Sequence, residues 1–149
     1  MAQVVQTIDV DVPVNISYNQ WTQFETFPEF LSVVESITQG DDEHLLWKVR
    51  VGGASREFTT AITEQIPDDR IAWTSTGGEV DHAGVVTFHR LSDTSSRVAA
   101  QIDWEPEGFV ETAGAVLHIP DAAVQAELKN FKKYIEDKGI ADGAWRGTV

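Results

Sequence analysis

One long amphipathic pattern near the C-terminus constrains the fold more than any other feature of this sequence. Between Gly108 and Lys138 apolar residues recur at steps of three and four, the period of one face of a helix. The apolar positions are Phe109, Ala113, Val116 or Leu117, Val124, Leu128, Phe131 and Ile135. A continuous helix of this length would extend roughly 44 Å. Because that exceeds the width of a small domain, we expect the rest of the chain to wrap around it.

The N-terminal third predicts one strand followed by two short helices. Apolar and polar residues alternate over residues 4–12, which is typical of a strand with one wet face, and Pro13 ends it. A helical period then begins at Asn15, which can serve as the cap, as can Ser17. Pro28 is predicted to break this helix and to open a second, shorter one through Val34.

Six further strands are predicted between the short helices and the long one. They cover about residues 34–38, 45–51, 56–66, 71–75, 84–91 and 98–104, and turn residues separate them. Gly52–Gly53 and Gly77–Gly78 are interpreted as hairpin turns. Hairpin-length connections indicate an antiparallel meander, and the alternation gives its sheet one apolar face.

The apolar face of this sheet needs a cover, and the C-terminal helix offers an apolar stripe of matching size. We therefore predict an α+β fold in which a curved antiparallel sheet of about seven strands wraps around that helix. With 149 residues and 42% hydrophobic content the chain suits one core. We expect a single domain over residues 1–140 and a C-terminal tail at residues 141–149.

Charge and composition narrow the classes of partner. The formal net charge is −13, which repels nucleic acid and anionic membrane surfaces. No apolar run is long enough to span a bilayer, and the first residues resemble no export signal, so we expect a cytoplasmic protein. The acidity itself is compatible with simple solubility or with an acidic docking face. The oligomeric state is left open.

The inward-facing positions of the predicted sheet combine large aromatic with small or polar side chains. A tightly filled core would use Leu and Ile more often at such places, so the composition indicates a cavity between sheet and helix. The predicted cavity lining is Trp47, Phe58, Thr60, Trp73, Ser75, Phe88, Trp104, Phe109, Ala113 and Leu117. Plain core packing is the alternative for each tryptophan.

A break in the long helix would create a movable segment beside this cavity. Pro120 removes a backbone donor, which predicts a kink or break near residues 117–120. Residues 109–118 would then form the cavity mouth together with the loop at residues 77–84. The predicted mouth residues are Phe27, Phe30 and His82. A bend that merely follows the curvature of the sheet is the alternative.

Signals for metal or cofactor chemistry are missing from the sequence. Cys is absent, and the four histidines share neither an i, i+4 spacing nor a nearby carboxylate at ligand spacing. We therefore expect no metal and no cofactor. His82 and His118 could reach the mouth as proton donors, although surface positions are the simpler interpretation.

The element order resembles a known superfamily. It combines Trp21, the corner Phe27-Pro28-Glu29-Phe30, the strand and turn at residues 61–73, and the final helix at residues 131–135. Together these resemble the START-like (SRPBCC) superfamily, most of all its polyketide cyclase/dehydrase and coenzyme Q-binding families. The resemblance implies a helix-grip fold with a cavity for an apolar or aromatic small molecule.

Two departures from that resemblance bear on catalysis. Aromatase/cyclase relatives place an arginine near the end of the strand before the Pro-Asp turn, where this chain has Thr63, Glu64 and Gln65. They also carry a tyrosine on the second short helix, where this chain has Val34. The resemblance therefore implies binding more readily than polyketide chemistry.

Three functions remain open at this point. The first is binding or carriage of an apolar aromatic, polyketide or isoprenoid-like molecule. The second is a cyclase or aromatase that uses Thr60, Thr63, Ser75 or His82 as polar groups. The third is an interaction module with an acidic surface and a collapsed core.

Overall fold

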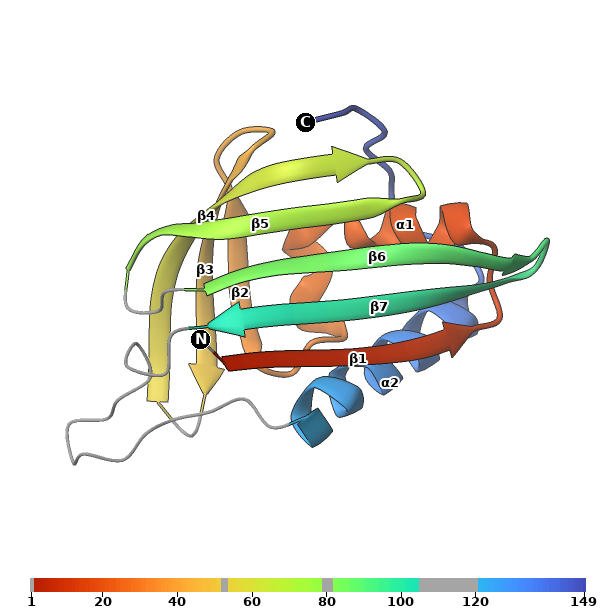
Figure 1. The fold of residues 1–149 in the computed structure, drawn as a ribbon, viewed down its shortest axis with the longest axis horizontal. Helices are drawn as coiled ribbons and strands as arrows, with labels where there is room; N and C mark the ends of the chain where they lie inside the picture. Colours follow the sequence, from red (N-terminus) through yellow and green to blue (C-terminus); the bar gives the residue numbers. More distant parts are fainter. Residues whose placement is uncertain (1, 52–53, 79–81, 105–120) are drawn as a thin grey trace.

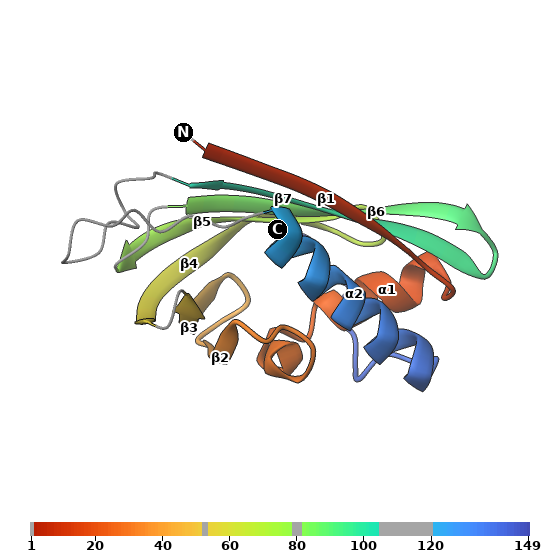
Figure 2. The ribbon, with the colours of Figure 1, turned by 90° about the horizontal axis from the view of Figure 1, so that it is seen from below.

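One seven-stranded antiparallel sheet forms the body of the molecule, and its helical segments all lie on one side (Figures 1 and 2). The computed structural model describes residues 2–51, 54–78, 82–104 and 121–149. In chain order the elements are β1 (Ala2–Val10), α1 (Val14–Trp21), the 3₁₀ helix η1 (Phe24–Glu29), β2 (Val34–Gln39), β3 (His44–Val51), β4 (Ala54–Ile66), β5 (Arg70–Gly78), β6 (His82–Ser92), β7 (Ser95–Trp104) and α2 (Asp121–Lys138).

The sheet has the order β1-β7-β6-β5-β4-β3-β2, so the first strand lies beside the last one. β1 pairs with β7 along its whole length, from Ala2 opposite Trp104 to Val10 opposite Ser96. The sheet curls so strongly that β2, β3 and β4 cross the direction of β1, β6 and β7 (Figure 1). Two register shifts between β4 and β5 fall at the bend, and such bulges increase local twist.

The helices cover the concave side of the curled sheet, with α1 and η1 next to α2 (Figure 2). α2 turns Val124, Leu128, Phe131 and Ile135 into the core, the positions on which the periodicity placed its apolar stripe. This arrangement confirms the predicted α+β fold in which a curved sheet grips the C-terminal helix. Residues 108–120 of the predicted helix, with the break expected near Pro120, lie outside the described residues.

The short helices begin and end earlier than the sequence predicted. α1 starts at Val14 with Pro13 as its N-cap residue, so neither Asn15 nor Ser17 caps it. Ser17 is buried instead, and its hydroxyl bonds with that of Ser96 at 2.8 Å. The prediction that Pro28 opens the second helix is wrong, because Pro28 lies inside η1, which already begins at Phe24.

The second helix also ends earlier than expected. η1 stops at Glu29, and Val34 is the first residue of β2 rather than the end of a helix. The break between the helical segments falls at Thr22, whose hydroxyl donates to the Asn19 carbonyl at 2.6 Å. A side-chain hydroxyl that bonds back to the preceding turn competes with continuation of the helix.

Gly77 and Gly78 were predicted to form a hairpin turn, and this is wrong. Both belong to β5, where they pair with Thr59 and Phe58 of β4. Gly78 has a φ of +105°, and a Cβ there would lie 2.5 Å from the Phe58 Cα atom. Close approach of two strands, combined with a left-handed backbone, explains the glycine at this position. The other predicted turn, residues 52–53, lies outside the described residues.

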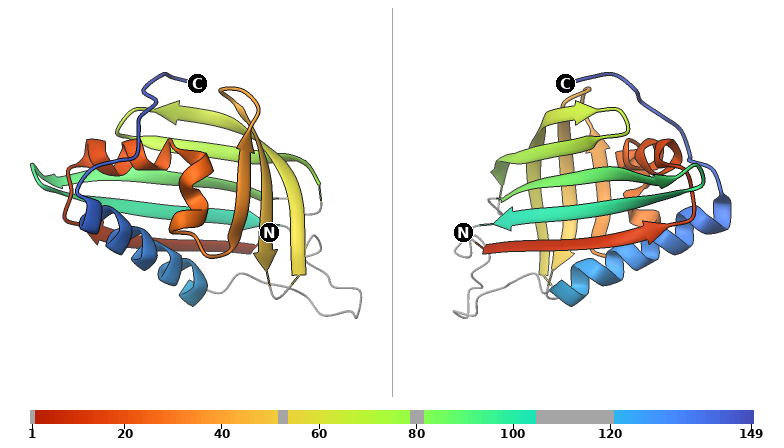
Figure 3. Two further views of the ribbon diagram at one scale, coloured as in Figure 1. Left: turned by 180° about the vertical axis from the view of Figure 1, so that it is seen from behind. Right: turned by 45° about the vertical axis from the view of Figure 1, so that its right-hand side comes forward.

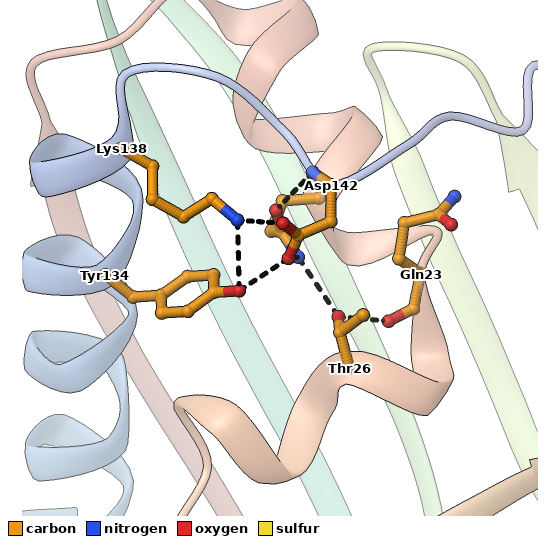
Figure 4. A network of polar contacts seen from close by, with 6 residues as sticks. Gln23, Thr26, Tyr134, Lys138 and Asp142 are labelled. Carbon is orange, nitrogen blue, oxygen red and sulfur yellow. Dashed lines mark hydrogen bonds and ion pairs between the residues drawn. The ribbon is translucent and has the colours of Figure 1, made fainter.

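The last residues contain no helix or strand, but they are tied to the body of the protein. From the end of α2 the chain crosses α1 (Figure 3, left). The Asp142 carboxylate accepts hydrogen bonds from Tyr134 at 2.5 Å and from the buried Gln20 at 3.1 Å, and it pairs with Lys138 (Figure 4). Val149 exchanges two backbone hydrogen bonds with Gln65 of β4.

Candidate functional site

A cavity of about 200 Å³ lies between the concave face of the sheet and the helices. Its wall from the sheet is Trp47, Val49, Phe58, Trp73, His82, Val86, Ala100 and Ile102. Val34 of β2 also belongs to the sheet wall, and the rest of the lining comes from the helices and the segment between η1 and β2, namely Trp21, Phe27, Leu31, Val33, Ala123, Val124, Glu127 and Leu128. Nearly all of these side chains are apolar, which is typical of small-molecule sites.

Three aromatic rings from neighbouring strands form a continuous surface on the sheet side of the cavity. The Trp47 ring is stacked between two others, with its centroid 5.7 Å from Phe58 and 6.3 Å from Trp73. The interplanar angles are 20° and 24°, so the rings present nearly parallel faces. Phe27 of η1 packs edge-on against Trp47, with centroids 6.0 Å apart. Flat apolar rings arranged in this way suit a flat aromatic guest.

Both indole N–H groups of this surface are satisfied inside the protein. Trp47 Nε1 donates to the buried Thr60 hydroxyl at 2.9 Å. Trp73 Nε1 donates to Nε2 of His82 at 3.1 Å. Because an indole has only this one polar atom, the two rings offer the cavity apolar surface alone. The hydrogen bonds also fix the orientation of each ring.

The contact with Trp73 fixes the orientation of the His82 ring. An indole N–H can only donate, so Nε2 of His82 is the acceptor in this contact. The ring also packs edge-on against Phe58, with centroids 4.7 Å apart, and the His82 backbone N–H donates to the Ser75 hydroxyl at 3.1 Å. These contacts position His82 as a ring of the cavity wall.

Gly84 provides the space in which the Trp73 indole lies. The two residues are opposite each other in the register of β5 and β6. A Cβ atom on Gly84 would lie 2.4 Å from Cζ2 of the indole, far inside van der Waals contact. The absence of a side chain at Gly84 therefore determines how deeply Trp73 sits against the sheet.

A carboxylate joins two parts of the cavity wall, α2 and the segment that connects η1 to β2, which we call the two lips of the cavity. Glu127 of α2 accepts a hydrogen bond from the backbone N–H of Ser32 at 2.6 Å, and its other oxygen bonds with the Ser32 hydroxyl. Leu31 and Val33, which flank Ser32, line the cavity. So does Val124, one turn before Glu127 on α2. The pair therefore holds α2 against the segment that connects η1 to β2.

The structure brings together some of the residues that the sequence singled out. Trp47, Phe58 and Trp73 line the cavity, and so do the predicted mouth residues Phe27 and His82. Their role in binding a ligand remains a prediction.

Four others lie away from the cavity wall. Thr60 and Ser75 accept the hydrogen bonds described above, and Phe88 packs against Tyr18 with centroids 5.3 Å apart. Phe30 packs against Trp21, Phe131 and Tyr134. The predicted lining residues Phe109, Ala113 and Leu117 and the side chain of Trp104 lie outside the described part of the chain.

Sequence reasoning missed most of the helical side of the wall. Val124 and Leu128 were on the predicted stripe but were not among the predicted lining residues. Leu31 and Val33 were not assigned to the cavity. Glu127 gave no signal at all, because a charged residue on an amphipathic helix is normally solvated.

The described residues contain no group of three or more His, Asp or Glu side chains placed to hold a metal ion. Within the same ranges, no helix combines the length and apolar character that a membrane crossing requires.

Comparison with known proteins agrees with this geometry. Residues 10–133 match the model of the family described as polyketide cyclase / dehydrase and lipid transport. An uncharacterized 17.2 kDa protein of Streptomyces lincolnensis, from its melC2-rnhH intergenic region, is 49% identical over 100% of this chain and 99% of its own length.

Two solved structures illustrate the shared fold. DR_A0006 from Deinococcus radiodurans has a TM-score of 0.74 at 20% identity, covering 93% of this chain and 99% of that one. A START superfamily protein from Mycobacterium smegmatis has a TM-score of 0.67 at 16% identity, covering 91% and 95%. The solved structures share the helix-grip fold of this chain. The match of the family model over most of the chain shows that the protein belongs to the polyketide cyclase / dehydrase and lipid transport family.

Proposed function

We propose that this protein binds a compact, apolar aromatic molecule in the cavity between its sheet and α2. The observation that carries the proposal is the stacked surface of Phe58, Trp47 and Trp73, whose two indole N–H groups are bonded within the protein. A wall built mainly of aromatic and aliphatic side chains gains most from an apolar, flat guest.

The size of the cavity limits the guest. An apolar cavity of about 150 Å³ is enough for benzene, and this cavity measures about 200 Å³. One ring, or two fused rings, is therefore the size that fits between the described walls. A longer polyketide or isoprenoid chain would need further space.

A cyclase or aromatase acting in the same cavity is the second candidate, because the matching family includes polyketide cyclases in its description. Of its four candidate polar groups, Thr60 and Ser75 already accept hydrogen bonds from the wall, and Thr63 is exposed. His82 alone remains on the cavity wall. One positioned imidazole supports binding and orientation better than it supports a multistep cyclisation.

A pair of neighbouring alanines allows a matched test of the proposal. Ala100 lines the cavity, whereas Ala99 points to the opposite face of β7. Titration of naphthalene, followed through tryptophan fluorescence, should show saturable binding to the wild-type protein. Ala100→Leu fills the site and should weaken binding about tenfold or more, whereas Ala99→Leu should leave it unchanged. Equal effects of the two substitutions, or no saturable binding to the wild type, would contradict the proposal.

The second candidate requires its own assay. A short polyketide mimic with alternating carbonyl groups should show no cyclisation above the buffer rate in the presence of the protein. Turnover that is lost in His82→Asn, while that variant still binds naphthalene, would instead favour the enzyme.

A further inference from the structure

The described wall of the cavity contains an acidic side chain but no lysine or arginine. Glu127 is the one residue of the types Asp, Glu, Lys and Arg among the described residues that line it. The Glu127 carboxylate accepts two hydrogen bonds from Ser32, one from its backbone N–H and one from its hydroxyl. A fixed negative charge therefore lies at the lip of an otherwise apolar space.

Basic side chains do not offset this charge on the described wall. No lysine or arginine is among the described residues that line the cavity, and Arg56 lies opposite the lining residue Val49 in the register of β3 and β4. The net charge of −13 adds a long-range field of the same sign.

Apolar ligands in cells differ in the charge that they carry, and such a site would distinguish anionic from neutral or cationic ones. Fatty acids and aromatic carboxylates are anions at neutral pH, and an anion loses its hydration when it enters an apolar cavity. Without a cationic partner this cost is not offset, and a nearby carboxylate increases it. Neutral molecules carry neither penalty, and an amine gains from the carboxylate.

We propose that the cavity excludes anionic ligands and accepts uncharged or cationic aromatic ones, and that Glu127 is the residue that determines this selectivity. The proposal rests on the function proposed above and specifies the chemical class of its ligand. The backbone N–H of Ser32, which remains in Ser32→Ala, holds the carboxylate at the lip.

Three naphthalene derivatives of similar shape test this selectivity at pH 7. 2-Naphthamide is neutral, 2-naphthoate is its anionic counterpart, and 2-naphthylmethylammonium is cationic. Dissociation constants come from tryptophan fluorescence and, independently, from calorimetry. We expect the amide and the amine to bind about tenfold or more tightly than the carboxylate.

The variant Glu127→Gln separates the carboxylate from the general cost of burying an anion. It should strengthen binding of 2-naphthoate about tenfold, weaken that of the amine and leave that of the amide nearly unchanged. Ser32→Ala keeps the carboxylate, so the order of the three ligands should persist. If Ser32→Ala removes the selectivity as fully as Glu127→Gln does, the closing contact rather than the charge is responsible, and the proposal fails.

The exposed Glu43 supplies a control for overall charge. Glu43→Gln changes the net charge from −13 to −12, as Glu127→Gln does, but it should leave the selectivity intact. Thermal unfolding of each variant shows that the protein is folded in the assay.

The outcomes distinguish the two proposals. Binding of 2-naphthoate as tight as that of 2-naphthamide overturns the charge selectivity while leaving the binding function in place. Such tight binding would point to Arg56 as a cationic partner for the naphthoate carboxylate, because Arg56 alternates onto the same face of β4 as Phe58. Failure of all three compounds to bind overturns the proposed function itself.

Discussion

Gly84→Ala is the substitution whose consequences the structure defines most closely. The new methyl group would lie 2.4 Å from Cζ2 and 2.7 Å from Cη2 of the Trp73 indole. Ordinary contacts between carbon atoms are about 3.5–4.0 Å, so the ring must move by about 1 Å or more. Such a shift lengthens the 3.1 Å hydrogen bond to His82 beyond bonding distance and disturbs the stack with Trp47.

The expected cost combines two effects. Overpacking a filled site costs about 1–3 kcal/mol, and loss of one hydrogen bond costs about 1 kcal/mol. Because the ring can move partly into the cavity, we expect Gly84→Ala to lower the free energy of unfolding by roughly 2 kcal/mol. For a chain of this size that corresponds to a fall in Tm of about 4–8 °C. Naphthalene binding should weaken about tenfold, since the displaced ring occupies its space.

A double-mutant cycle tests the cause. Trp73→Phe removes the part of the indole that the new methyl group would strike, so the double variant should be no less stable than Trp73→Phe alone. Gly40→Ala is the matched control, because a Cβ there lies 3.8 Å from its nearest neighbour, the His44 carbonyl oxygen. Additive effects of Gly84→Ala and Trp73→Phe, or a Gly84→Ala variant as stable as the wild type, would refute this reasoning.

Three further predictions concern the frame around the cavity. Thr60→Val leaves the buried N–H of Trp47 without its acceptor and should cost about 1–3 kcal/mol in urea unfolding; an unchanged midpoint would contradict the role of this bond. Asp142→Ala removes the acceptor that joins α1 to α2 and should cost about 1–2 kcal/mol in the same assay, whereas wild-type stability would show that the tail contributes nothing. The Arg97 guanidinium, which bonds to both carboxylate oxygens of Asp9, holds the pKa of Asp9 below its ordinary value. A lowered pKa contributes stability above the unfolded value that is lost as the pH falls through the folded value. Because the pair is exposed, Asp9→Asn should cost only about 0.5 kcal/mol at pH 7 and nothing near pH 2; a cost that does not change with pH would rule out this charge effect.

The sequence predicted the fold well because repeating patterns of apolar residues along the strands and along α2 specify it. Alternation along each strand and the stripe along α2 are properties of local sequence, and both follow from which side faces the core. The same alternation placed Trp47, Phe58 and Trp73 on the inner face of the sheet, where they line the cavity. Their stacking needs the register between strands, which the sequence does not contain.

The predictions failed where a single contact decides the outcome. Pro28 is an ambiguous signal, because a proline can open a helix or lie inside a short 3₁₀ helix. Gly77 and Gly78 suggested a turn, but the close approach of β4 requires glycine within the strand. Glu127 joins the cavity only because Ser32, distant in sequence, meets it.

The indole N–H resonances of the five tryptophans provide the most direct test of the central claim, that this cavity accepts an aromatic guest. In a titration with naphthalene followed by ¹H–¹⁵N correlation spectra, the resonances of Trp21, Trp47 and Trp73 should shift together and saturate. The resonance of Trp145, in the tail and outside the cavity lining, should stay in place as an internal control. Unchanged resonances of the three cavity tryptophans at the solubility limit of naphthalene, or a shift confined to Trp145, would contradict the account.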